Sequence, residues 1–451
     1  MEKVVTAMQT TEKQLQQQQH NKKSDFEAAV GMSRKWDAQE AGREVAQTAL
    51  EKLSGPPKFF LLFSTIHYEK HGGFQEFLNG VWEVLPEGTP LIGGTVAGFM
   101  NNYGCYTHGA TALAVSYPNM DVAIGYGKNT KRNPKKAAKN CIKMIDEKLN
   151  NSSYKNKFII DIISGGVVPQ IFGMGRKKVV RGISSKIAIN LSQLSLKLFQ
   201  KGVGREEEVL EELSKKFDDC FFLHCSSMDD GKAVNNFQFL NDTFGTNMLV
   251  CLAISINLQM MISSKNNLRE IKKFTVTKLS KDGRVIHEIH NKPAAEEFLR
   301  LLDWPEDYYD ERLFKRTFFY PLGYKKEDYW IPGIIGMVLG DSMSVLHRIR
   351  NPEMAILSAS GKELVAALKD SIKKIDPNNT LLYIISSCDG RLEAMGGQIF
   401  KEHEELLNYF GDIPFIALFC GGEGIKEPKE KMRYGNVTIN TFSIIKEKKM
   451  L

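Results

Sequence analysis

Apolar and polar positions follow the same order in two stretches of the chain that lie 324 residues apart. Each begins with a continuous apolar run, at 59–64 and 381–386, which is typical of a strand buried on both faces. A glycine pair, an amphipathic helical stripe and a second apolar strand ending in a glycine turn follow. In both units a proline stands 18 residues after the first glycine of the pair, Gly72 or Gly396. We therefore predict an internal repeat of strand, helix, strand and strand.

A looser third copy lies between these two units. Residues 158–163 form an apolar run before Gly165-Gly166, helical segments extend to about residue 217, and strands are predicted at 221–225 and 247–258. Helices that alternate with strands, together with several direct strand-to-strand steps, indicate mixed sheets with helices on their outer faces. The predicted fold class is α/β, with some α+β character.

The chain is predicted to have a tail and two halves. Residues 1–25 are rich in Gln and Lys, so we expect a disordered tail. Residues 263–285 are rich in Ser, Asn and Lys, and Asp282-Gly283 within them is a hairpin signal. We place the boundary between the halves near residue 265.

The composition narrows the class of protein. Of 451 residues, 42% are hydrophobic and 25% are charged, which is too apolar for a disordered chain. The net charge of +7 is small for this length, so no nucleic-acid interface is predicted. The longest apolar stretch, 248–262, is shorter than the roughly 20 residues that cross a bilayer. We therefore expect a soluble protein without a membrane partner.

The number and spacing of the cysteines indicate the cellular compartment. The seven cysteines include no Cys-x-x-Cys pair, so neither a disulfide framework nor a zinc site is predicted. The N-terminus has no apolar core of the signal-peptide type. These features favour a reducing, cytoplasmic location.

Short motifs along nearly the whole chain occur in a characteristic order. They are Leu61–Ser64, Leu91–Gly98, Phe221–Asp230 with Asn236–Phe239, Thr275–Leu302, Ser387–Arg391 and Pro414–Ile425. In this order and spacing the chain resembles the FIST family, named for F-box and intracellular signal transduction proteins. The resemblance places a FIST N-terminal domain at 26–265 and a FIST C-terminal domain at 266–446.

The resemblance implies a sensory module of signal transduction without catalytic activity. Such a module is expected to bind a small, amino-acid-like molecule between its two halves and to pass the signal by contact with a downstream protein. Some members of the family look like haem-based nitric oxide sensors, which makes haem an alternative ligand. Haem needs an axial ligand, most often His, and His67, His71 and His224 lie near predicted strand ends.

The candidate ligand-binding residues come from the strand ends. Glycine turns let a backbone approach a ligand and present its N–H groups. A guanidinium fork after a strand can hold a carboxylate or phosphate, and a carboxylate on a glycine turn can hold an amine. Ordinary tight turns and buried pairs would explain the same residues. The predicted set is Arg391, Glu423, Cys388, Gly421, Gly422, Gly93, Gly94, Ser226, Ser227 and Asp229.

A cysteine-dependent hydrolase is the second alternative. A Cys–His nucleophile pair would need Cys388 or Cys225 beside one of His67, His71, His224 and His403. Free cysteines are more often small buried apolar residues. We therefore expect no enzymatic activity.

Overall fold

Three six-stranded sheets with the same strand order form most of the structure. The computed structural model describes residues 25–169, 175–326 and 329–446, and it also contains a nine-stranded sheet. Helices make up 29% and strands 38% of the residues. These proportions and the mixed sheets confirm the predicted α/β fold with two halves. The predicted tail lies outside the described residues, except for its last residue.

Each six-stranded sheet takes four of its strands from one sequence unit of strands and helices. The first unit contains β1 (Glu27–Ser33), α2 (Ala38–Leu50), β2 (Phe59–Ser64), α3 (Phe74–Trp82), β3 (Leu91–Thr95), β4 (Gly98–Asn101), β5 (Gly104–Tyr106) and β6 (Ala110–Ser116). The second contains β7 (Met120–Lys128), α4 (Pro134–Asn150), β8 (Asn156–Ser164), α6 (Glu206–Lys216), β10 (Phe221–Ser227), β11 (Gln238–Leu240), β12 (Thr243–Gly245) and β13 (Met248–Ile256). An insertion between β8 and α6 carries β9 (Val179–Val180) and α5 (Ser185–Phe199).

The third unit is interrupted by the nine-stranded sheet. The unit contains β14 (Gln259–Lys265), α9 (Gly361–Ile372), β23 (Thr380–Cys388), α10 (Asp389–Met395), α11 (Ile399–Phe410), β24 (Phe415–Cys420), β25 (Glu423–Lys426), β26 (Arg433–Gly435) and β27 (Ile439–Ile445). Between β14 and α9 lie β15 (Arg269–Leu279), β16 (Val285–Ile289), β17 (Lys292–Pro293), α7 (Ala294–Leu301), α8 (Leu313–Arg316), β18 (Leu322–Lys326), β19 (Tyr329–Gly333), β20 (Ile335–Leu339), β21 (Ser342–Val345) and β22 (Glu353–Ser358). With β9, these strands form the fourth sheet.

The three units exchange hairpins in a cycle. The sheet orders are β1-β6-β2-β3-β11-β12, β7-β13-β8-β10-β25-β26 and β14-β27-β23-β24-β4-β5. In each sheet one strand pair is parallel (β2 with β3, β8 with β10, β23 with β24) and the other neighbours are antiparallel. The outermost hairpin always comes from another unit: β11-β12, β25-β26 or β4-β5. The repeat seen in the sequence is therefore threefold, and three sheets surround the interior.

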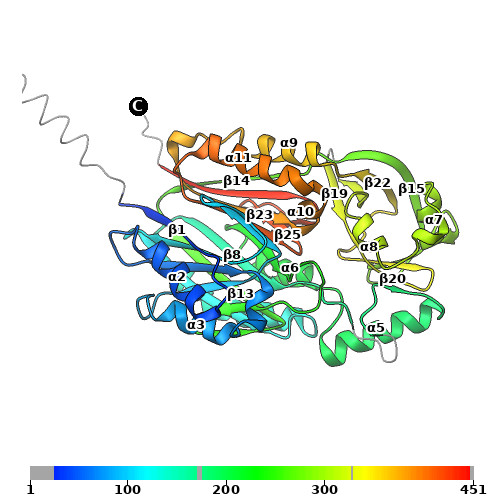
Figure 1. Cartoon of the computed structure of the whole chain (residues 1–451), viewed down its shortest axis with the longest axis horizontal. Coiled ribbons are helices and arrows are strands. Elements are labelled where there is room, and N and C mark those ends of the chain that lie inside the picture. Colours follow the sequence, from blue (N-terminus) through cyan, green and yellow to red (C-terminus); the bar gives the residue numbers. More distant parts are fainter. Residues whose placement is uncertain (1–24, 170–174, 327–328, 447–451) are drawn as a thin grey trace, which may run out of the picture.

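A single apolar core lies where the inner faces of the three sheets meet. It includes Leu61 from the first sheet, Ile160 from the second and Ile384 from the third, all at most 2% exposed. The outer faces pack on helices: α2 and α3 cover the first sheet, α4 and α6 the second, and α9, α10 and α11 the third. Figure 1 shows α2 and α3 below the strands and α9 and α11 above them. This arrangement explains why the predicted strands are apolar on both faces.

Prediction for the separated halves. Residues 1–265 expressed alone lack β25 and β26 of the second sheet and β23, β24 and β27 of the third, so β10 has a free edge and the core has an open side. We expect this fragment to bind a hydrophobic dye and to show no cooperative thermal transition. Circular dichroism and dye fluorescence measure both, and co-expression with residues 266–451 should restore the transition. A cooperative transition of the isolated fragment would contradict the shared core.

Candidate functional site

A cavity lies at the carboxyl ends of the parallel strands of the second and third sheets. Gly166 follows β8, Met228 follows β10, Asp389 follows β23 and Gly421 follows β24, and all four line the cavity. This is the end of an α/β sheet at which ligands usually bind. The opposite wall comes from the fourth sheet and its helices. Its residues are Phe314, Phe318, Ile334, Gly336, Met337, Ser344 and Leu346.

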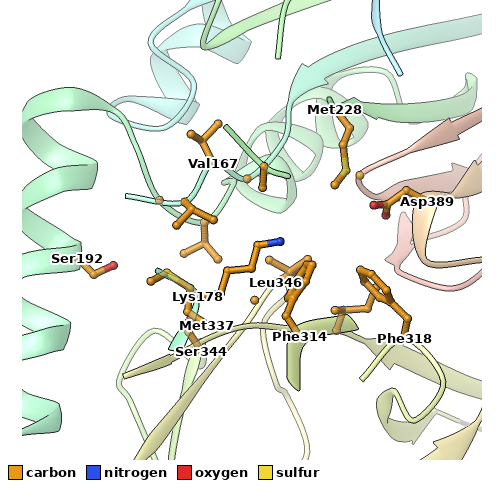
Figure 2. Close-up of a pocket in the computed structure, with 18 residues that line it drawn as sticks. Val167, Lys178, Ser192, Met228, Phe314, Phe318, Met337, Ser344, Leu346 and Asp389 are labelled. Carbon is orange, nitrogen blue, oxygen red and sulfur yellow. The ribbon is translucent and has the colours of Figure 1, made fainter. Parts of the chain in front are cut away.

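Two charged side chains reach a largely apolar interior. Lys178, from the insertion of the second unit, extends over the Phe314 ring with its nitrogen 3.7 Å from the ring centroid. Figure 2 shows this nitrogen directed toward the side of the cavity where Asp389 lies. Burial lowers the pKa of Lys178, and the carboxylates of Asp229 and Asp389 oppose that effect. An ammonium and a carboxylate therefore face one small apolar space.

Asp389 titrates near neutrality. Burial raises the pKa of its carboxyl to about 7, against hydrogen bonds from the Gly390 backbone and the Cys388 thiol. Asp389 begins α10, where the positive end of a helix favours a carboxylate. Its charge consequently changes across the physiological pH range.

The cavity is small. Its volume is about 50 Å³, and one water needs about 10–15 Å³ by this measure, so about four waters would fill it. Met228, Phe314 and Phe318 line it with flexible or rotatable side chains. The space therefore suits a ligand of few atoms with an apolar portion.

Among the predicted ligand-binding residues, Asp229 shapes the cavity wall indirectly. Its carboxylate accepts hydrogen bonds from the backbone N–H groups of Ala233 at 2.8 Å and Val234 at 2.6 Å. Ala233 lines the cavity, and the Lys178 ammonium donates to the carbonyl oxygen of Gly231 in the same loop at 3.2 Å. Asp229 thus fixes the loop that holds Lys178.

The structure does not bring Arg391 to the cavity. Its guanidinium is fully buried, donates from Nε to Ser387 Oγ at 2.9 Å and forms an ion pair with Glu402 of α11. Arg391 therefore joins α10 to α11 and to β23.

Glu423 is fully buried at the start of β25. Its Oε1 accepts hydrogen bonds from the N–H of Thr438 at 2.7 Å and from the Thr438 hydroxyl at 2.8 Å. Within the described residues its Oε2 has no hydrogen-bond partner. Burial raises the pKa of Glu423 to about 8. Glu423 and Arg391 do not form a pair with each other.

The predicted serines belong to buried networks. Ser227 Oγ donates to the carbonyl oxygen of Ile163 at 3.2 Å and accepts from Gln238 Nε2 at 2.6 Å. Ser226 Oγ lies 3.0 Å from His224 Nε2, and the other ring nitrogen of His224 contacts Asp161. The sequence analysis missed this Asp–His–Ser order, because Asp161 and His224 are 63 residues apart.

The Asp161–His224–Ser226 order is that of a catalytic triad with a serine nucleophile. The surroundings of the three side chains, however, do not suit catalysis. All three side chains are fully buried. The Ser226 hydroxyl also donates a hydrogen bond to Glu206 Oε1 at 3.2 Å. A substrate carbonyl has no access to the hydroxyl, so this network acts as a buried connection between β8, β10 and α6.

Most of the predicted glycines are packing positions. A Cβ atom at Gly93 would overlap the carbonyl oxygen of Leu62, and one at Gly94 would lie 2.7 Å from that of Phe237. A Cβ atom at Gly422 would lie 2.6 Å from the Tyr434 hydroxyl. Gly421 differs, since its Cβ would meet only Met228, with Sδ at 3.0 Å. Of these four glycines, Gly421 alone lines the cavity.

The cysteines of the hydrolase alternative are buried, and the histidines of the two alternatives make other contacts. Cys388 and Cys225 are buried, and burial raises the pKa of Cys388 well above its ordinary value. Both ring nitrogens of His224 are engaged, whereas His67 packs edge-on against the Trp36 ring at 5.9 Å. No group of three or more potential metal ligands occurs among the described residues. The hydrolase and haem alternatives both remain predictions.

Family models match most of the chain. The FIST N domain model matches residues 58–292 and the FIST C domain model matches residues 294–426. The chain belongs to the FIST family. FIST domains are associated with signal transduction and sensing. The two matches meet at residue 293, whereas the division near residue 265 is still a prediction.

One solved structure is weakly similar to this FIST protein. A crystal structure of a "cyanuic acid hydrolase" from A. caulinodans is similar over 93% of this chain and 99% of that chain, at 7% identity and a TM-score of 0.30. No curated protein matches the chain. No helix in the described parts of the chain is long and apolar enough to span a membrane.

Prediction for two glycines. Gly93→Ala forces a methyl group into the Leu62 backbone, so we expect a loss of about 3 kcal/mol or more in the free energy of unfolding. Gly421→Ala meets only the flexible Met228 side chain, so a change below about 1 kcal/mol is expected. Thermal unfolding of both variants tests the assignment. Equal losses would show that Gly421 is also a packing position.

Prediction for Glu423. Because its folded-state pKa is about 8, raised from the ordinary value, the stability it contributes below pH 4.5 is lost as the pH rises to 8. Between these two pKa values, each increase of one pH unit costs about 1.4 kcal/mol of folding free energy. Glu423→Gln should therefore lose less thermal stability than the wild type between about pH 5 and pH 8.5. The exposed Glu427→Gln variant is the control, and an equal decline in all three proteins would contradict the raised pKa.

Proposed function

We propose that this FIST protein is a cytoplasmic sensor that binds a small amino-acid-like zwitterion in the cavity at the strand ends. The observation that carries the proposal is the pair of opposite charges, Lys178 and Asp389, in a small space with apolar walls. The Lys178 ammonium holds the ligand carboxylate, and the Asp389 carboxylate holds the ligand amine. Charge-assisted hydrogen bonds of this kind are about twice as strong as neutral ones.

The walls select for an apolar side chain. Phe314, Phe318 and Met228 surround the charged pair, and the small volume limits the side chain to a few carbon atoms.

The signal passes from the cavity through the fourth sheet to a second protein. That sheet supplies one wall of the cavity, while the strand ends supply the other. A ligand that contacts both walls changes the position of one against the other. The cytoplasmic location agrees with seven cysteines that are all free thiols.

Prediction for ligand binding. Isothermal titration with glycine, alanine, serine and valine should detect one site, and Lys178→Met and Asp389→Asn should each weaken it at least tenfold. The exposed Lys177→Met variant should bind like the wild type, since Lys177 does not line the cavity. Binding by the variants with unchanged affinity would refute the site.

Prediction for the pH dependence of that binding. The Asp389 carboxyl, with a pKa of about 7, must be ionised to hold an ammonium. Affinity should therefore rise about tenfold between pH 6 and pH 8, while Asp389→Asn should lose this dependence. The titrations are repeated at the two pH values, and a wild-type affinity that is flat with pH would exclude the carboxylate as the amine-binding group.

A further inference from the structure

A second, larger cavity lies beside the first and has a different character. Its volume is about 390 Å³, and it shares Ser192, Gly202, Val203 and Ser344 with the walls of the first. Two carboxylates line it, Glu208 and Asp282. Six cationic side chains also line it: Lys131, Arg132, Lys197, Arg205, Arg284 and Arg348. The lining therefore carries an excess of positive charge.

Three of the arginines are held in place by one carboxylate. Glu208 contacts Arg205 at 3.0 Å, Arg284 at 3.0 Å and Arg348 at 2.9 Å. Arg284 is only 5% exposed and contacts Glu207 as well, at 3.0 Å. These ion pairs hold the guanidinium groups in one position, so they do not move freely in the solvent. They form a rigid basic wall.

Lys131 differs from these arginines because no carboxylate contacts it. It is 1% exposed, and its ammonium donates to Ser164 Oγ at 2.9 Å and to Asn247 Oδ1 at 3.0 Å. Both acceptors are neutral, and an ammonium has three donors. Among the described residues, no carboxylate oxygen lies within ion-pair distance of its nitrogen.

A buried ammonium without a counter-ion is costly. The effective penalty for burying one ion is several kcal/mol unless an opposite charge or enough hydrogen bonds offset it. Burial lowers the pKa of Lys131 to about 8. The charge of Glu206 raises this pKa, but only by electrostatic attraction without a direct contact. Glu206 is itself buried, and burial raises the pKa of its carboxyl, so it is a weak counter-charge. The basic cavity that Lys131 lines is where an outside anion would supply the missing charge.

We propose that this second cavity binds a small multivalent anion carrying phosphate or carboxylate groups, with Lys131 as its buried counter-ion and Arg132 at the entrance. Arg132 is exposed and donates to the carbonyl oxygens of Lys197 and Leu198 at 2.8 and 2.6 Å. It therefore joins the end of α5 to the edge of the site. This site is separate from the zwitterion site, since neither Lys131 nor Arg132 lines the first cavity.

Calorimetric titration of the full chain with pyrophosphate and with citrate, at constant ionic strength set by KCl, tests the proposal. At least one of the two anions should bind at millimolar concentration or below, and Lys131→Met should weaken it at least tenfold. Lys139→Met, on the exposed face of α4, is the matched control and should leave the affinity unchanged. Binding of pyrophosphate alone would identify a phosphate site, and binding of citrate alone a carboxylate site.

Two further variants guard against a folding failure and distinguish the two cavities. If Lys131→Met does not fold, Arg132→Gln should still weaken the anion at least threefold, because Arg132 lies at the exposed edge of the cavity. Lys178→Met should leave anion binding unchanged, which separates this site from the first cavity. The proposal is overturned if neither anion binds, if removing Lys131 or Arg132 leaves the affinity unaltered, or if Lys178→Met abolishes the binding.

Discussion

The rest of the structure depends on one constraint: three sheets must bury their inner faces against one another at the same time. Each inner face is apolar, and in the described part of the chain the core between these faces contains no helical residue. Removing any sheet would expose the inner faces of the other two, at a cost of about 25 cal/mol for every Å² of apolar surface. The exchanged hairpins complete the edges of the sheets, and the helices are left to cover the outside. The carboxyl ends of the parallel strands then converge, which creates the place for a binding site.

Sequence patterns predicted much of this fold, for a physical reason. The runs around Leu61 and Ile384 are apolar on both faces because one face meets the common core and the other meets helices. The spacing of Gly72 and Gly396 from the following prolines showed that the units are related. The hairpin exchange has no such signal, because a hairpin has the same sequence whether it pairs with its own sheet or with a neighbour.

The site was harder to predict than the fold. A cavity does lie at strand ends, and Gly421 lines it, but the predicted ligand-binding set stays a prediction. Arg391 and Glu423 have the chemistry of ligand-binding residues, but their partners, Glu402 and Thr438, lie 11 and 15 residues further along the chain. Lys178 and Lys131 stand in segments without a motif. The roles proposed for them rest on burial, which only the assembled tertiary structure reveals.

The cyclic exchange of hairpins also sets an order of events during synthesis. The first sheet can close once residue 245 has left the ribosome, whereas the third needs β27, which ends at Ile445. Those roughly 200 residues take about 10–40 s to translate at typical rates. For that time the nascent chain carries an apolar sheet face and the free edge of β10. Holding such a surface until the last unit arrives is a task for chaperones, and it makes the end of the chain the step that completes folding.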